Sequence, residues 1–350
     1  MDRMVVLRRI PTERRLSTIV GRGELGPEEL DAVARAIARF HADEDQVADV
    51  EAFAADHRGR WTAINEAMND LSGPLLDTST TAQIDDLVAS YLDHHLAMFE
   101  SRVADGYVRR VHGDLRADHV ILLEEGPQLI GADALDDQLP VGDVLADVGS
   151  LALDLHRLAG PALARALIAE YQRYSGEVHP SSLAHHYVAL EAACRCIEAG
   201  NQVAGGRLEF AAVARMYHRL CLDQLLRASA RIVMVGGGPG SGKSTLANEL
   251  GERFGWTVVS SEDIRRGLTA GMKSAGPATA DQGVYAPEVT DACYDEMMRQ
   301  TDLLLTAGHS VVLDASWTEN DQREKVRSVA AAHGAALVEF ECHVDLATAR

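Results

Sequence analysis

Hydrophobic residues recur at every third or fourth position over most of the first two thirds of the chain. Within residues 28–41 these positions fall on one face, with Pro27 near the first turn, which predicts an amphipathic helix. The same spacing predicts further helices at about 82–103 and throughout 151–228, with a break at 200–206 and a final helix from about 209. The region is therefore expected to be mostly helical.

Short apolar runs alternate with helical segments in the last third of the chain. Such runs are typical of buried parallel strands, and they occupy residues 231–235, 256–261, 310–314 and 335–342. A helix predicted over 287–307 ends at Gly308, a residue that often follows helix C-termini. This alternation predicts an α/β fold, a parallel doubly wound sheet with helices on both faces, preceded by the helical region.

The length and composition of the chain predict the number of domains and the cellular compartment. A chain of 350 residues is too long for one ordinary core, so we expect two domains, 1–228 and 229–350. A hydrophobic content of 47% with 25% charged residues is typical of soluble globular proteins. The sequence has no apolar run of about 18 residues and no signal-peptide pattern, which predicts a cytoplasmic protein without a membrane partner. Five cysteines without a C-x-x-C pair indicate reduced core thiols.

The charge is negative in both parts of the chain. The net charge is −20, and residues 231–350 carry 11 basic and 17 acidic residues, leaving 22 basic and 36 acidic residues for 1–230. Neither part offers an extended basic surface. The balance therefore disfavours a nucleic acid partner.

A glycine-rich loop follows the first run of the second domain. Residues 237–244 match G-x-x-x-x-G-K-[ST], the phosphate-binding (Walker A) pattern, in which backbone N–H groups and a helix N-terminus surround an anion. Only three lysines occur in the chain, which argues against a chance match in an ordinary glycine-rich turn. Lys243 would reach the β- and γ-phosphates of ATP, and Ser244 would bind Mg²⁺. The candidate nucleotide-binding residues are Gly237, Gly238, Gly240, Ser241, Gly242, Lys243, Ser244 and Thr245.

Two further apolar runs, at 108–111 and 120–123, flank a polar loop with the sequence H-G-D-L-R-A-D-H. This loop resembles the catalytic loop of the aminoglycoside phosphotransferase family. The downstream segment 142–155 resembles the family's structural segment, so the resemblance covers roughly residues 1–225. The resemblance implies that Asp114 is the base that orients or deprotonates an acceptor hydroxyl. A second interpretation of His112 and Asp114 is that they only brace a hairpin through hydrogen bonds.

Three departures from that family predict that the first domain is degenerate. His119 stands where the family has a metal-binding Asn, although Mg²⁺ prefers oxygen ligands. Gly131 stands where the metal-binding Asp belongs, and Asp133 would replace it only after a register slip. Residues 1–230 contain no lysine to hold the α- and β-phosphates. The family's glycine-rich lobe would have to precede Met1. The sequence itself begins with an apolar run at residues 4–7, which predicts a short strand.

Acidic and basic residues follow the second and third runs of the second domain. Glu262 and Asp263 could accept the proton of an acceptor hydroxyl, and Arg265 could hold an anionic group on that molecule. The other interpretation is a helix N-terminus that merely favours acids. Asp314 is expected to hold Mg²⁺ through water, in a Walker-B-like role. Thr318 and Asp321 predict a capped helix start, and Arg323 on that helix would face the phosphates or solvent.

These segments together resemble the gluconate-kinase, zeta-toxin and polynucleotide-kinase group of phosphate-loop kinases. The order of the two halves resembles bifunctional proteins with an aminoglycoside phosphotransferase-like part and an ATP-binding part. In that kinase group an arginine-bearing lid helix and a fifth strand follow the fourth strand, whereas this sequence stops at Arg350. We therefore expect either a piece of a longer protein or a form that binds nucleotide without efficient transfer.

The sequence predicts Mg²⁺-dependent phosphoryl transfer from ATP to a hydroxyl of a small molecule. The catalytic residues would be Lys243, Glu262, Asp263 and Arg265 in the second domain, with Asp114 as the candidate in the first. Two alternatives remain: an aminoglycoside or sugar phosphotransferase acting through Asp114, and a non-catalytic regulatory protein that responds to nucleotide. The acceptor is not identified by the sequence.

Overall fold

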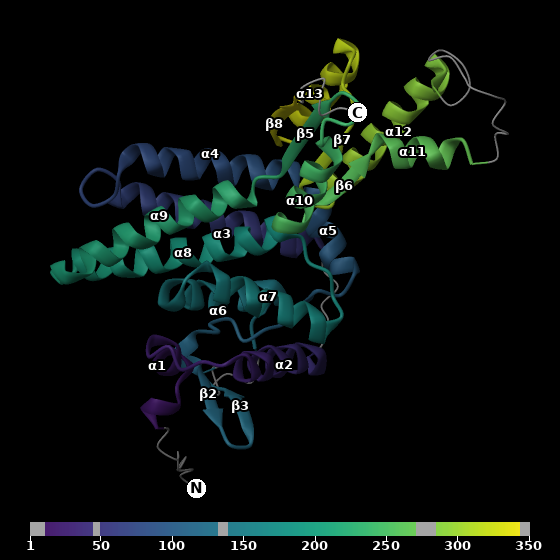
Figure 1. The fold of residues 1–350 in the computed structure, drawn as a ribbon. Coiled ribbons are helices and arrows are strands. Elements are labelled where there is room, and N and C mark those ends of the chain that lie inside the picture. Colours follow the sequence, from purple (N-terminus) through teal and green to yellow (C-terminus); the bar gives the residue numbers. More distant parts are fainter. Residues whose placement is uncertain (1–10, 45–49, 132–138, 271–284, 344–350) are drawn as a thin grey trace, which may run out of the picture. The chain divides into compact units, whose positions relative to one another are not determined.

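The computed structural model describes residues 11–44, 50–131, 139–270 and 285–343, and these form two compact units (Figure 1). Counting the described residues alone, the first unit lies within Met1–Val88, Phe99–His179 and Leu183–Leu226, and the second lies within Ala89–Met98, Pro180–Ser182 and Arg227–Arg350. The strand predicted at residues 4–7 lies outside the described residues. The junction predicted at Ser229 stays a prediction.

Helices predominate before residue 229, as the spacing predicted. They are α1 (Leu16–Gly21), α2 (Pro27–Asp43), α3 (Val50–Leu71), α4 (Thr78–His94), α5 (Leu96–Ala104), α6 (Val144–Ala159), α7 (Pro161–Ser175), α8 (Ser181–Ala204) and α9 (Ala211–Ala228), with short 3₁₀ turns at Thr12–Arg14, Ala117–His119 and Leu208–Phe210. Two antiparallel pairs join β1 (Val108–Arg110) to β4 (Val141–Asp143) and β2 (Val120–Leu123) to β3 (Gly126–Leu129). The pairs hold the polar loop between β1 and β2.

The helix boundaries differ from the prediction at three places. Residues 82–103 form two helices rather than one, with the break at His95, whose ring nitrogen Nδ1 lies 2.9 Å from the Tyr91 carbonyl oxygen. Helix α8 continues to Ala204, so the glycine break is shorter than expected. Helix α3 was not predicted, although Trp61, Ile64 and Met68 are buried at helical spacing.

The second unit contains a fully parallel sheet in the order β6-β7-β5-β8. The strands are β5 (Arg231–Gly237), β6 (Thr257–Ser260), β7 (Val311–Asp314) and β8 (Ala336–Cys342), and the helices are α10 (Lys243–Phe254), α11 (Ser261–Leu268), α12 (Pro287–Thr306) and α13 (Asn320–Ala332). Gly308 follows α12 with φ +77°, as predicted for a C-terminal glycine.

Alternate residues of β5 face opposite layers of helices. Ile232 and Met234 pack with buried residues of α12 and α13, such as Met297, whereas Val233 and Val235 pack against Ala247 of α10. Both faces of the central strand are therefore covered, which explains its continuous apolar run. The predicted doubly wound α/β fold is confirmed.

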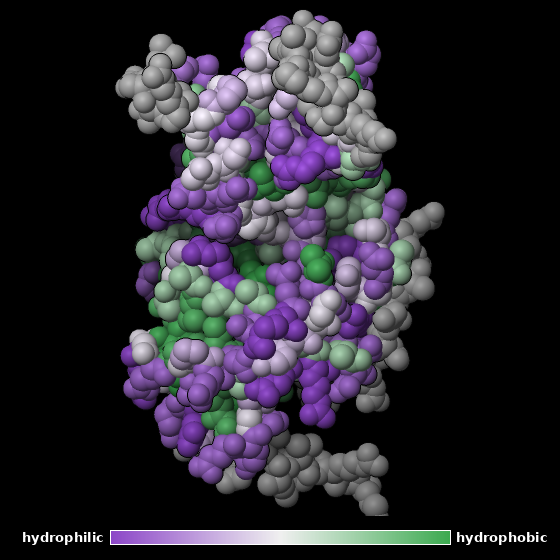
Figure 2. Space-filling model, turned by 45° about the vertical axis from the view of Figure 1, so that its right-hand side comes forward, coloured by the Kyte–Doolittle hydropathy of each residue, from purple (hydrophilic) through white to green (hydrophobic). Residues whose placement is uncertain are grey.

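The surface is mainly polar on the face drawn in Figure 2, where hydrophobic residues gather in limited patches between hydrophilic ones. Among the described residues, none of the helices combines the length and the apolar character needed to cross a membrane.

A buried histidine pair in the first unit makes stability depend on pH. His57 Nε2 lies 2.9 Å from His186 Nε2, which also accepts the indole N–H of Trp61 at 3.0 Å. Burial of the ring, which disfavours the cation, lowers the pKa of His57 from 6.5 to about 4, against an opposing effect of Asp143. The folded protein therefore keeps His57 neutral at a pH where the unfolded chain takes up a proton.

We expect the free energy of unfolding to fall as the pH is lowered from 6.5 to about 4, with His57 contributing about 3 kcal/mol of that loss. The contribution is complete above pH 6.5, since both states are then neutral at this ring. Urea unfolding across this pH range measures the effect. The variant His57→Phe should show a flatter profile than the wild type; equal slopes would contradict the assignment.

Candidate nucleotide site and the loop between β1 and β2

The predicted phosphate loop connects the end of β5 to the start of α10. Three of its glycines have positive φ, namely Gly237 (+144°), Gly240 (+74°) and Gly242 (+85°). A Cβ on Gly237 would lie 2.5 Å from Ser241 Oγ and 2.7 Å from the Cys342 carbonyl oxygen, so this turn requires glycine. The loop ends at the N-terminus of a 12-residue helix, where free N–H groups favour an anion.

Strand pairing brings the loop next to the end of β7. Val235 of β5 pairs with Asp314 of β7, and the Ser244 hydroxyl donates to Asp314 Oδ2 at 2.7 Å. Asp314 is 5% exposed, and its second carboxylate oxygen, Oδ1, has no hydrogen-bond partner among the described residues. A buried carboxylate oxygen without a donor suits a hard cation, so Ser244 and Asp314 fit a Mg²⁺ site.

Lys243 is half-buried at the first position of α10 and, within the described part of the chain, forms no ion pair. Its ammonium group remains available for an anion held by the loop. Ser241 Oγ is buried without a hydrogen-bond partner in the described residues, and Thr245 is exposed on the first turn of the helix. The structure thus brings together the loop residues predicted from the sequence.

Glu262 and Asp263 lie exposed in the first turn of α11, directly after the end of β6. Asp263 forms an ion pair with Arg266 at 3.1 Å, whereas Arg265 donates to Thr290 Oγ1 at 3.2 Å and stacks over the Tyr285 ring. Because Ser260 pairs with Asp314, this turn starts at the same edge of the sheet as the Ser244–Asp314 contact. Among the described residues Glu262 forms no ion pair, whereas Asp263 is paired with Arg266, so Glu262 is the acid with fewer competing contacts there.

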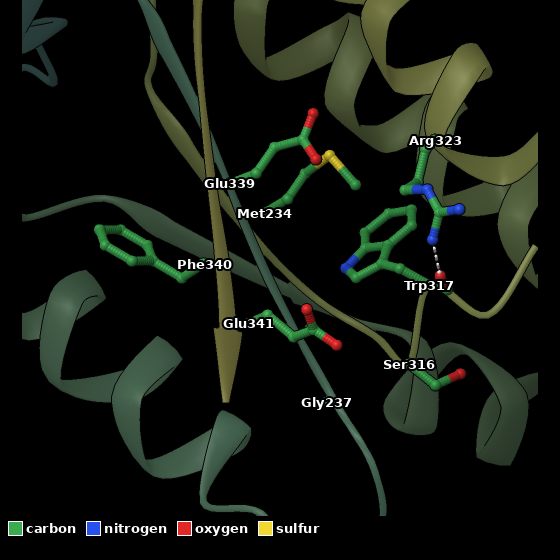
Figure 3. Close-up of a pocket in the computed structure, with 9 residues that line it drawn as sticks. Met234, Gly237, Ser316, Trp317, Arg323, Glu339, Phe340 and Glu341 are labelled. Atoms are coloured by element: carbon green, nitrogen blue, oxygen red, sulfur yellow. Dashed lines mark hydrogen bonds between the residues drawn. The ribbon is translucent and has the colours of Figure 1, made fainter. Parts of the chain in front are cut away.

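Arg323 does not simply extend into solvent. Its guanidinium donates to the Trp317 carbonyl oxygen at 2.5 Å and lines a cavity that also includes Gly237 (Figure 3). The capped helix start predicted from Thr318 and Asp321 is wrong, because Glu319 occupies the N-cap without a side-chain hydrogen bond. Trp317, which the sequence analysis overlooked, has φ +52° and is buried.

In the first unit, two aspartates of α6 brace the H-G-D loop. Asp147 accepts from the backbone N–H groups of His112 (2.6 Å) and Gly113 (2.8 Å), and Asp154 accepts from that of Ala117 (2.9 Å). Both aspartates belong to the segment 142–155 that the sequence analysis identified as structural. His41 Nε2 also contacts this carboxylate, at 3.1 Å from Asp147 Oδ2, a contact that was not predicted from the sequence.

The carboxylate of Asp114 is engaged by its own loop. Arg116 forms an ion pair with it and also contacts Glu198 at 3.0 Å, while His119 Nδ1 lies 2.6 Å from the Asp114 carbonyl oxygen. The ring of His119 packs against Gly131, where a Cβ would lie 3.3 Å from it. Asp133 lies outside the described residues. No described residues assemble a cluster of three or more metal-binding side chains here or elsewhere.

Comparisons with known proteins agree with this two-part organisation. The family model described as "Phosphotransferase enzyme family" matches residues 3–184, and an "AAA domain" model matches residues 232–350. An uncharacterized protein of Mycobacterium tuberculosis is 32% identical over 342 residues, which cover 97% of this chain and 69% of that protein.

Two partial matches carry the names of kinases. Adenylate kinase isoenzyme 1 of Cyprinus carpio is 37% identical over 79 residues, covering 21% of this chain and 41% of that enzyme. A solved structure of a kinase candidate from Chloroflexus aurantiacus matches with a TM-score of 0.29 and 15% identity, covering 33% of this chain and 59% of that one. With the family model spanning more than half of its residues, the chain belongs to the phosphotransferase enzyme family and carries a second, phosphate-loop domain of the AAA type.

Proposed function

We propose that residues 229–350 bind ATP with Mg²⁺ and transfer its γ-phosphoryl group to a hydroxyl of a small molecule. The observation that carries the proposal is the 2.7 Å contact between Ser244 Oγ and Asp314 Oδ2 at the foot of a glycine-rich loop. This contact joins the two residues expected at a magnesium–nucleotide site. The second carboxylate oxygen of Asp314 has no hydrogen-bond partner in the described residues. Bound Mg²⁺ would neutralise charge on the phosphates.

Each group of the site has a proposed role. Backbone N–H groups from Gly237 to Thr245 would surround the phosphates, and Lys243 would neutralise charge that develops on the transferred group. Glu262, which has fewer competing contacts than Asp263, would accept the hydroxyl proton, and Arg265 would orient the acceptor.

In this proposal the first domain has a structural rather than a catalytic role. Arg116 neutralises the Asp114 carboxylate, and His119 takes the place of an oxygen ligand for a metal. A second candidate is phosphotransfer through Asp114, which is favoured by the bracing of its loop by Asp147 and Asp154.

The two candidates differ in which variant stops turnover. ATP consumption with a panel of sugars, nucleosides and amino alcohols should be lost in Lys243→Ala and kept in Asp114→Ala. Turnover that survives in Lys243→Ala and disappears in Asp114→Ala would replace the proposal by the second candidate. ATP binding without turnover of any acceptor would favour the regulatory alternative.

Removing the carboxylate charge at Asp314 should weaken Mg²⁺-dependent nucleotide binding. We expect Asp314→Asn to raise the Mg²⁺ concentration needed for half-maximal ATP binding by about tenfold or more, since an amide neutralises no cation charge. Calorimetric ATP titrations at several Mg²⁺ concentrations measure this. Asp295→Asn, which removes a surface carboxylate paired with Lys325, is the matched control and should leave the Mg²⁺ dependence unchanged.

A further inference from the structure

A cavity of about 370 Å³ lies beside the phosphate loop, between the carboxyl ends of β5 and β8 and the start of α13. Its walls include Met234, Gly236, Trp317, Arg323, Glu339 and Glu341 (Figure 3). This volume is at the lower end of the range for small-molecule sites. Because Gly236 and Gly237 border the cavity, its occupant would lie next to the phosphate site.

Trp317 forms a fixed wall with one unused donor. Its carbonyl oxygen accepts from Arg323, its backbone N–H lies 3.4 Å from the Tyr294 hydroxyl, and its ring meets that of Tyr294 edge to face. The absence of a Cβ on Gly236 lets the indole edge approach β5, since a Cβ there would lie 3.2 Å from Trp317 Cδ1. The indole Nε1 is buried and has no hydrogen-bond partner among the described residues.

Opposite charges lie at separate places on the cavity wall. Arg323 forms no ion pair with any described residue, so its charge is not neutralised by a neighbouring carboxylate. Glu339 is paired with Arg327 at 3.1 Å, whereas Glu341 is 74% exposed and contacts only His343, at 3.5 Å, among described residues. In the view of Figure 3, Arg323 and the Glu341 carboxylate lie on opposite sides of the Trp317 indole.

From this arrangement we propose that the cavity binds a small zwitterion, a molecule with one carboxylate and one ammonium group. The carboxylate pairs with the Arg323 guanidinium, the ammonium group pairs with Glu341, and the connecting carbon atoms lie along the indole. A purely anionic ligand would meet Glu339 and Glu341, and a purely cationic one would meet Arg323. The assignment replaces the phosphate contact predicted for Arg323 from the sequence.

The binding claim does not depend on phosphoryl transfer. L-Homoserine is a suitable probe, because 4-hydroxybutyrate is the same molecule without the ammonium group and 3-aminopropan-1-ol is the same molecule without the carboxylate.

In the test, each probe is titrated into the protein without nucleotide. Binding is measured by tryptophan fluorescence and by calorimetry. We expect saturable binding of homoserine in the millimolar range or tighter, and at least about tenfold weaker binding of the other two probes. Arg323→Gln should weaken homoserine about tenfold without changing ATP affinity, and Glu341→Gln should do the same. Glu252→Gln, on α10, is the control and should change neither the affinity for homoserine nor the affinity for ATP.

Several results would overturn the zwitterion site. These are equal affinities for the three probes, no saturable signal with homoserine in the millimolar range, or binding that neither variant weakens. ATP affinity, measured separately in every variant, shows whether the second domain is folded and whether the nucleotide proposal fails on its own. Trp317→Phe should remove the fluorescence response while Trp61 and Trp256 remain.

Discussion

The variant Lys243→Ala should lose ATP affinity by about 100-fold or more, equivalent to about 3 kcal/mol of binding free energy. Lys243 is the first residue of α10 and makes no ion pair within the described residues, so its charge serves no structural partner there. Removing it should leave stability nearly unchanged while removing the cation that faces the bound phosphates. Calorimetric titration with ATP and Mg²⁺ measures the loss.

The matched control uses another lysine of the same domain. Lys325 pairs with Asp295 at 2.5 Å on the surface of α13, and Lys325→Ala removes the same charge away from the phosphate loop. ATP affinity should stay within about twofold of wild type in this variant, because exposed ion pairs contribute little and are screened by salt. Equal losses in the two variants would mean that net charge, rather than the loop, determines the affinity.

Replacing Asp147 by alanine should lower the free energy of unfolding of the first domain by about 3–5 kcal/mol. The side chain is 2% exposed, accepts two backbone N–H groups from the H-G-D loop and contacts His41 at 3.1 Å. Alanine would leave those donors buried without an acceptor. Urea unfolding of the full chain, followed by circular dichroism, measures the change.

An exposed aspartate provides the comparison for this variant. Asp86 lies on the outer face of α4, and Asp86→Ala should change stability by no more than about 0.5 kcal/mol. ATP affinity should be unchanged in Asp147→Ala at temperatures where the protein stays folded, because the nucleotide is assigned to the second domain. A loss of ATP binding in the folded Asp147→Ala variant would favour the site at Asp114.

Features encoded in consecutive residues could be predicted from the sequence. The four strands of the second domain and the helix at residues 27–43 follow from local spacing, and they are confirmed with shifts of one or two residues. Three glycines of the phosphate loop, Gly237, Gly240 and Gly242, have positive φ, and that requirement is visible as a pattern of residue types. Strand order then brings Asp314 to Ser244, as expected for a parallel sheet.

Features that depend on contacts between distant segments could not be predicted. The His57–His186 pair joins residues 129 positions apart, and His41 reaches Asp147 across 106 positions. The left-handed backbone of Trp317 is stabilised by Arg323 and Tyr294, and no local rule places a tryptophan there. The ion pair between Asp114 and Arg116 was also overlooked, although both residues belong to the quoted loop.

The central claim is that ATP binds at the phosphate loop of the second domain, and hydrogen–deuterium exchange with and without ATP and Mg²⁺ tests it most directly. We predict that ATP slows exchange of the backbone amides of residues 237–246, which would donate to the phosphates, and leaves residues 112–119 unchanged. Protection of residues 112–119 with no change at 237–246 would contradict the account.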